Sequence, residues 1–214
     1  MILALNGSPR RSGNTASMLQ AALDGAASMG METRMIHLYQ LQYKRCISCF
    51  SCKLKGGEHG KCDMKDDLSP ILEMMQSADA LIFGAPIYYS NITPELLALL
   101  HRFMFSNMLY TKENRWQFKR RLPSAFVYTF GVPPEMTESV VAPFEGVHKR
   151  MCEMLGFQPE VCCAANAWQF TDYSRYEASQ FDATAKKRYR DDVFPRELQA
   201  AREMGIRLAQ KASA

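Results

Sequence analysis

The chain has 214 residues, of which 47% are hydrophobic and 22% charged, and a formal net charge of +4. This length predicts one domain, residues 1–214, with a substantial core. The mild charge permits an anionic cofactor, and the lack of a long basic run argues against nucleic acid as a partner. No apolar run approaches the roughly 20 residues of a membrane helix. Because the chain opens on a strand pattern rather than a signal peptide, we expect a cytoplasmic protein with reduced thiols.

Short apolar runs alternate with amphipathic stretches along the chain. We expect strands at residues 2–5, 33–38, 78–84, 124–130 and 159–166. We expect helices at residues 14–29, 66–75, 94–107 and 135–155, the last bent at Pro143, and a two-piece helical tail at 177–212. This alternation predicts an α/β fold, in which a parallel sheet is covered by helices on both faces. Ligands of such sheets bind at the carboxyl ends of the strands.

A loop of small polar residues joins the first strand to the first helix. Its hydroxyl, amide and backbone N–H groups, with the positive end of the helix dipole, suit a terminal phosphate. The loop lacks the Gly-Lys-Ser/Thr of a nucleoside-triphosphate site and the GxGxxG of a dinucleotide site. An ordinary capped turn is the alternative. The candidate groups belong to Gly7, Ser8, Ser12, Gly13, Asn14 and Thr15.

Four of the seven cysteines lie close together, with the spacing Cys46-x2-Cys49-x2-Cys52-x9-Cys62. A Cys-x2-Cys-x2-Cys run with a more distant fourth cysteine is typical of an iron–sulfur cluster. Structural zinc sites more often use two separated Cys-x2-Cys pairs. The spacing therefore favours a [4Fe–4S] cluster, with metal-free thiols or zinc as alternatives, and with His59 as a possible substitute for Cys62.

Three motifs together resemble the NADPH-dependent FMN reductase family. They are Gly7-Ser8-Pro9-Arg10 with Ser12-Gly13-Asn14-Thr15, then Gly84-Ala85-Pro86-Ile87-Tyr88-Tyr89-Ser90, and then Thr129-Phe130-Gly131. The cysteine segment makes the likeness greatest to the iron–sulfur flavoproteins of that family. The resemblance covers roughly residues 1–165 and implies a flavodoxin-like, doubly wound, five-stranded sheet of order 2-1-3-4-5 that binds FMN.

The resemblance also implies roles for single residues. It assigns the FMN phosphate to Ser8, Arg10, Ser12, Gly13, Asn14 and Thr15. It places the isoalloxazine ring along Pro86, Ile87, Tyr88, Tyr89, Ser90 and Asn91, with Thr129, Phe130 and Gly131 closing the site. A flavin ring requires such an apolar wall together with polar donors at its edge.

These observations predict an FMN-dependent oxidoreductase that takes a hydride from NAD(P)H. Its acceptor would be a quinone, a free flavin, a redox protein or the cluster, and the flavin chemistry requires no catalytic side chain. The alternative is a non-catalytic FMN electron carrier or redox-sensing module, although such carriers are usually acidic. The family resemblance further implies a dimer or tetramer, with residues 110–121 and the tail as candidates for the interface and for covering the flavin.

Overall fold

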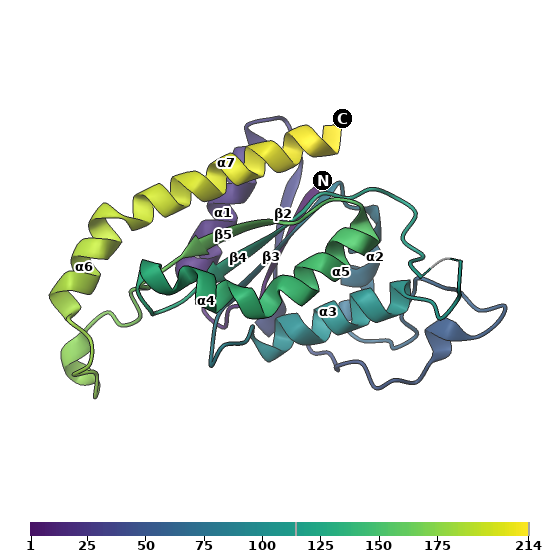
Figure 1. Cartoon of the computed structure of the whole chain (residues 1–214), viewed down its shortest axis with the longest axis horizontal. Coiled ribbons are helices and arrows are strands. Elements are labelled where there is room, and N and C mark those ends of the chain that lie inside the picture. Colours follow the sequence, from purple (N-terminus) through teal and green to yellow (C-terminus); the bar gives the residue numbers. More distant parts are fainter. Residues whose placement is uncertain (114, 214) are drawn as a thin grey trace.

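The computed structural model describes residues 1–113 and 115–213, and it contains a five-stranded parallel sheet (Figure 1). The strand order is β2-β1-β3-β4-β5, which confirms the predicted order. Crossover connections through helices are required because neighbouring strands are parallel. The strands are β1 (Ile2–Asn6), β2 (Thr33–His37), β3 (Ala80–Pro86), β4 (Ser124–Thr129) and β5 (Glu160–Ala164).

The helices lie near their predicted positions, except that the tail becomes helical at Ala183 rather than at residue 177 and that the segment 135–155 is divided. They are α1 (Asn14–Ala27), α2 (Leu68–Ser77), α3 (Pro94–Asn107), α4 (Thr137–Val141), α5 (Glu145–Leu155), α6 (Ala183–Asp192) and α7 (Phe194–Ser213). The single helix predicted over 135–155 is instead divided into α4 and α5 by a 3₁₀ turn at Ala142–Phe144. Pro143 explains the division, because proline lacks the N–H that would continue the helix. No helix in the described part of the chain is long and apolar enough to span a membrane.

The side chains of β1 alternate between two hydrophobic cores, one on each face of the sheet. Ile2 and Ala4 pack in the core that includes buried residues of α1 and α7. Leu3 and Leu5 pack in the core that includes buried residues of α2, α3 and α5. Figure 1 shows α7 beside α1 and, across the sheet, α5 beside α3. Coverage of both faces accounts for the nearly continuous apolar sequence of the strands.

Helices α1 and α7 approach until their backbones touch. A Cβ atom on Gly25 of α1 would lie 2.0 Å from the carbonyl oxygen of Arg202, and one on Gly205 of α7 would lie 1.8 Å from that of Ala22. Only glycine fits at these two positions without moving a helix. The C-terminal helix is therefore packed tightly on the first helix of the chain.

The strand register brings the carboxyl ends of the strands together. Asn6, the last residue of β1, is paired with His37 of β2 and with Gly84 of β3. Thr129, the last residue of β4, is paired with Pro86 and with Ala164. The loops that leave these residues consequently begin at one edge of the sheet, which is where a ligand site was expected.

Candidate functional site

A cavity of about 310 Å³ lies at this edge of the sheet. All three predicted loops contribute to its walls. The predicted residues in the lining are Ser8, Arg10, Gly13, Asn14, Thr15, Pro86, Ile87, Tyr88, Thr129, Phe130 and Gly131. Ala167, Gln169 and Phe170, from the segment after β5, complete the lining and were not among the predicted residues.

The loop after β1 is held by side chains beneath it. The amide oxygen of the buried Asn6 accepts from the Ser8 N–H at 2.9 Å, and the Ser8 hydroxyl accepts from the Arg10 N–H at 3.2 Å. The amide nitrogen of Asn6 lies 3.0 Å from Nδ1 of His37. Burial and the nearby charge of Arg11 lower the pKa of His37. His37 therefore favours its neutral form, which leaves Nδ1 free to accept from Asn6.

The N-terminus of α1 opens toward the same cavity. Its N-cap residue, Gly13, forms no side-chain capping bond, and the first turn of α1 contains no acidic residue. The first N–H groups of a helix have no partner within the helix. With no carboxylate beside them, these groups and the helix dipole favour an anionic ligand.

A pair of buried threonines connects α1 with the end of β4. The hydroxyl oxygens of Thr15 and Thr129 lie 2.8 Å apart. One hydroxyl donates to the other, so the pair retains one O–H hydrogen that a ligand oxygen can accept. Nearby, the Thr93 hydroxyl donates to the carbonyl oxygen of Gly7 at 2.7 Å, which joins the loop after β1 to the start of α3.

The loop after β3 contains a tight turn with unusual backbone angles. The N–H of Tyr88 donates to the Asn91 carbonyl at 2.9 Å, and the Asn91 N–H donates to the Tyr88 carbonyl at 3.0 Å. Tyr89 and Ser90, between them, have φ angles of 47° and 60°. Such two-residue turns usually use Asn-Gly. Two non-glycine residues in the left-handed region indicate local strain, which proteins retain mainly at functional sites.

Four of the predicted cofactor residues are not part of the cavity lining. Ser12, Tyr89, Ser90 and Asn91 are all exposed, although each belongs to a loop that contributes other residues to the cavity. Of the segment predicted to run along the flavin ring, Pro86, Ile87 and Tyr88 line the cavity, and the three residues after Tyr88 do not. The roles of these four residues stay predictions.

The segment after β5 is attached directly to the loop after β1. Nη1 of Arg10 donates to the Gln169 carbonyl at 2.7 Å, and Nδ2 of Asn14 donates to the Trp168 carbonyl at 3.2 Å. Phe170 stacks on Tyr176, with ring centroids 4.2 Å apart. The density of aromatic residues between 168 and 176 was the one sequence signal that could have drawn attention to this segment.

The four clustered cysteines lie around a second, much narrower cavity. Cys46, Cys49, Cys52 and Cys62 all contribute to its lining, and none of them forms a disulfide. Its volume of about 10 Å³ is close to that needed for one water molecule. In residues 1–113 and 115–213, no three His, Cys, Asp or Glu side chains are placed to hold a single metal ion.

Arg102 of α3 attaches both ends of the cysteine segment to the body of the protein. Its buried guanidinium donates to the Lys44 carbonyl at 3.2 Å and to the Met64 carbonyl at 3.1 Å. It also donates to both carboxylate oxygens of Asp66. Burial alone would raise the pKa of Asp66, but hydrogen bonds from Arg102 and from the Lys44 N–H, with the Arg102 charge, hold it below its ordinary value.

The same arginine lines the cavity of the four thiols, and its Nε has no hydrogen-bond partner within the described residues. A buried N–H donor without an acceptor is uncommon in native proteins. This donor belongs to a residue that borders the cavity of the four cysteines.

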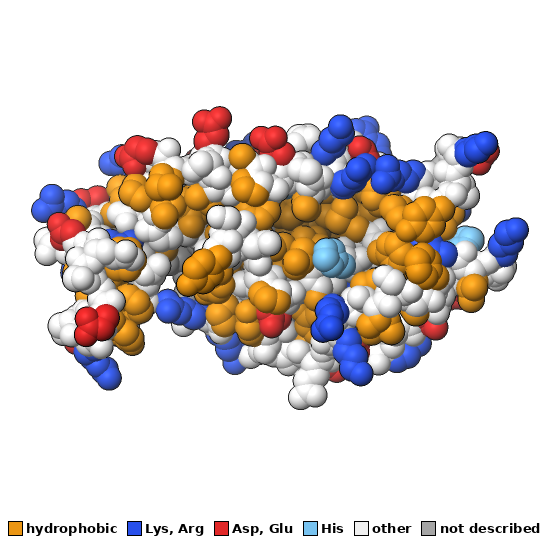
Figure 2. All heavy atoms as spheres, turned by 60° about the horizontal axis from the view of Figure 1, so that its bottom comes forward, with side chains coloured by type: hydrophobic (Ala, Val, Ile, Leu, Met, Phe, Trp, Pro, Cys, Tyr) orange, Lys and Arg blue, Asp and Glu red, His pale blue; other side chains and the backbone are white. Residues whose placement is uncertain are grey.

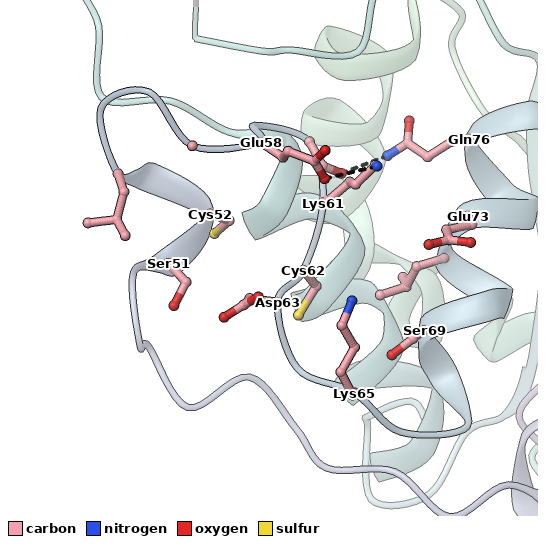
Figure 3. Close-up of a pocket in the computed structure, with 14 residues that line it drawn as sticks. Ser51, Cys52, Glu58, Lys61, Cys62, Asp63, Lys65, Ser69, Glu73 and Gln76 are labelled. Carbon is pink, nitrogen blue, oxygen red and sulfur yellow. Dashed lines mark hydrogen bonds and ion pairs between the residues drawn. The ribbon is translucent and has the colours of Figure 1, made fainter.

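Two larger openings lie on either side of the cysteine segment. One, of about 500 Å³, separates this segment from α2; Figure 3 shows Cys52 coming from the Ser51–Lys53 turn and Cys62 from the stretch that returns to α2. The other is an apolar groove of about 650 Å³ between α3 and α5, whose lining includes Cys46, Met104 and Trp116. Figure 2 shows hydrophobic side chains gathered on this face of the molecule.

Curated proteins with similar sequences match part of this chain. An iron–sulfur flavoprotein of Methanocaldococcus jannaschii is 38% identical over 101 residues, which is 47% of this chain and 50% of that protein. One of Archaeoglobus fulgidus is 37% identical over 107 residues, which is 50% of each. The chain thus spans about half the length of these curated relatives.

Solved structures match nearly the whole chain. An NAD(P)H:quinone oxidoreductase from Methanothermobacter marburgensis has a TM-score of 0.69 at 16% identity, with 97% of this chain and 98% of that one covered. An FMN-dependent NADH-azoreductase from Bacillus anthracis, solved in complex with FMN, has a TM-score of 0.66 at 17% identity and the same coverage. At these identities the likeness shows a shared fold.

The sequence profile of one family, NADPH-dependent FMN reductase, matches residues 1–135. These residues contain β1, β2, β3 and β4 and the three loops that line the larger part of the 310 Å³ cavity. Because the match extends over more than half of the sequence, the chain belongs to the NADPH-dependent FMN reductase family.

Proposed function

We propose that residues 1–214 form a single-domain FMN-dependent oxidoreductase that transfers electrons from NAD(P)H to a small acceptor such as a quinone. The observation that carries this proposal is the cavity at the carboxyl edge of the sheet, which combines an uncapped helix N-terminus with an apolar wall. The family match supports the cofactor, and the names of the quinone oxidoreductase and the azoreductase that share this fold support the class of acceptor.

The residues present are suited to the two ends of FMN. The N–H groups at the start of α1, with Ser8 and the pair of Thr15 and Thr129, would hold the phosphate. Pro86 and Ile87 would shield the ring from water. When bound, FMN supplies the hydride and electron transfer, so that the protein has to bind, orient and desolvate it rather than to provide an acid or a base.

We also propose that the four clustered thiols hold an iron–sulfur cluster. Thiolates are the ordinary ligands of such clusters, and four of them border one cavity here. The unpartnered Nε of Arg102 and the name of the curated relatives support the same proposal. Because the cavity has room for about one water molecule, the segment has to open to admit a cluster.

The first experiment is an absorption spectrum of protein purified without oxygen, with iron and sulfide measured on the same sample. Flavin bands with about four irons per chain are expected. Flavin without iron would restrict the proposal to an FMN enzyme with free thiols, and the absence of flavin even after FMN is added would contradict the proposed function.

Steady-state oxidation of NADH and of NADPH then separates an enzyme from an electron carrier. Turnover with a quinone or free flavin is expected from the proposal. The alternative, a non-catalytic FMN carrier or redox-sensing module, predicts no such turnover but rapid reduction by a reduced redox protein. The formal charge of +4 favours the enzyme, because carriers that dock on basic partners are usually acidic.

We infer further that a second copy of the chain covers the apolar groove between α3 and α5. The groove includes the partly buried Met104 and Trp116 and borders Cys46. Covering it would exclude water from Cys46 as well as from the apolar side chains. Light scattering of wild type and of Met104→Lys tests this inference: a wild-type oligomer that becomes monomeric is expected, and a wild-type monomer would contradict it.

A further inference from the structure

Lys186 of α6 is buried and joins two loops that border the FMN cavity. It is only 4% exposed. Its Nζ donates to Oδ1 of Asn166 at 2.8 Å, to the carbonyl of Gly131 at 3.0 Å and to the carbonyl of Ala167 at 3.4 Å. An ammonium group has three N–H donors, and each has an oxygen acceptor here. Gly131 and Ala167 belong to the cavity lining.

The charge of Lys186 is not neutralised by these partners. All three are carbonyl or amide oxygens, and no carboxylate forms an ion pair with it within the described residues. The ring of Phe181 lies 4.9 Å from Nζ and further excludes water. Burial lowers the pKa of Lys186, as expected for a cation that has lost hydration.

Lys186 also connects helix α6 to the loops at the edge of the cavity. It is the one buried residue of α6, whose other residues are exposed or partly exposed. One turn further along α6, Nη1 of Arg190 donates to Oδ1 of Asn14 in the proposed phosphate loop at 2.7 Å. Helix α6 therefore contacts the site through two cations, of which Lys186 is the buried one.

The residues that Lys186 holds lead directly into the wall of the cavity. Asn166 has a φ angle of 44°, a left-handed conformation that asparagine tolerates better than most residues. Gln169 and Phe170 follow it in the cavity lining, and Arg10 donates to the carbonyl of Gln169. By holding Asn166 and Ala167, Lys186 determines where the segment that lines the cavity begins.

We propose that Lys186 is a positioning residue for FMN: by holding residues 166–170 against the loop after β4, it keeps the cofactor site closed and slows the release of FMN. This inference rests on the proposed function, because it takes FMN as the ligand of the cavity. Lys186 acts through Asn166, Gly131 and Ala167 rather than by touching the reacting atoms.

The test compares Lys186→Met with Lys187→Met in the full chain. Methionine has nearly the length of lysine but neither its charge nor its donors. Lys187 is the adjacent lysine, is exposed, and forms an ordinary helix-surface ion pair with Asp191. Lys187→Met therefore removes the same formal charge without removing any of the three hydrogen bonds that Lys186 donates.

FMN release is measured by the rise in flavin fluorescence after dilution. Loss of charge-assisted hydrogen bonds predicts release at least about tenfold faster in Lys186→Met, and little change in Lys187→Met. Asn166→Ala should reproduce part of the effect, and adding it to Lys186→Met should cause less than the sum of the two, because both remove the same contact. Equal release rates in wild type and Lys186→Met would overturn the inference.

A second measurement does not depend on FMN. Hydrogen exchange of residues 166–182 in the FMN-free protein should be faster in Lys186→Met than in Lys187→Met, with unchanged protection of β1 and β3. Unchanged exchange in residues 166–182 would show that Lys186 does not hold the segment. Faster exchange in a protein whose wild type does not bind FMN would instead overturn the proposed function and the cofactor part of this inference.

Discussion

The buried guanidinium of Arg102 and the partly buried carboxylate of Asp66 form an ion pair, with Nη1 at 2.6 and 2.8 Å from the two oxygens. Arg102 lies in α3, and Asp66 lies just before α2. The same arginine holds the carbonyl oxygens of Lys44 and Met64, which flank the four cysteines. One side chain therefore determines where the cysteine segment begins and ends.

Arg102→Met is expected to destabilise the protein by about 1–3 kcal/mol, because it removes the hydrogen bonds to both ends of the segment and leaves the partly buried carboxylate of Asp66 without its partner. Urea unfolding measures this loss, and limited proteolysis should show earlier cleavage between residues 44 and 64. Lys187→Met is the control, since Lys187 forms an exposed pair with Asp191 at 2.7 Å. Similar losses in the two variants would show that the pair with Asp66 does not fix the segment.

The hydrogen bond between Thr15 and Thr129 predicts that replacing both threonines costs less stability than the two single replacements added together. Either substitution to valine leaves one buried hydroxyl without its partner and should cost about 1–3 kcal/mol of stability. The double substitution removes both polar groups and should cost less than the sum of the two. FMN titration should show weaker binding in all three variants. Additive losses in urea unfolding would contradict the coupling inferred from their 2.8 Å separation.

The turn between Tyr88 and Asn91 predicts that Tyr89→Gly stabilises the protein. Glycine adopts a φ angle of 47° without the penalty of about 1–2 kcal/mol that an L-residue pays in the left-handed region. Tyr110→Gly is a suitable control, because Tyr110 is also exposed but lacks a positive φ. Thermal unfolding measures the difference between them. Weaker FMN binding by Tyr89→Gly would support the predicted contact of Tyr89 with the flavin ring.

His148 predicts a loss of stability at mildly acidic pH. The Tyr128 hydroxyl lies 2.8 Å from Nε2 of His148, and burial lowers the pKa of His148 below its ordinary 6.5. Between the folded and unfolded pKa values, the unfolded chain binds more protons, so the free energy of unfolding falls as pH drops below about 6.5. His37, whose pKa is also lowered, contributes in the same direction.

Thermal unfolding from about pH 7.5 to about pH 5 checks this dependence. His148→Gln should reduce the slope, because glutamine can still accept from Tyr128 but does not titrate. The slope that remains includes the contribution of His37. An unchanged slope in His148→Gln would contradict the assignment.

The parallel α/β class and the loops at the carboxyl edge could be predicted from the sequence pattern, because apolar runs such as 78–84 alternate with amphipathic stretches, while the strand order could be predicted from the family resemblance. The direction in which individual loop side chains point could not be predicted. Tyr88 borders the cavity while Tyr89 points to solvent, and this difference follows from a left-handed φ angle at Tyr89. Ser12 is exposed and Thr15 is buried, because Ser12 precedes α1 whereas Thr15 lies in its first turn.

Contacts between distant segments were also beyond sequence reasoning. Arg10 and Gln169 are 159 positions apart, and no local pattern relates them. Arg102 appears in the sequence as a charged residue within an apolar stretch of α3, and its buried state depends on Asp66, 36 positions earlier. Such pairings become visible only when the fold places the two groups together.

The touching backbones at Gly25 and Gly205 limit how this chain can be recombined with its relatives. A hybrid that takes the first helix from another family member and keeps α7 from this chain would fold only if the donor helix also has glycine at the position of Gly25. Any larger residue there would displace α7 and, through it, the neighbouring α6 with Lys186. Segments containing α1 or α7 can therefore be exchanged between homologues only where glycine is kept at both contact positions.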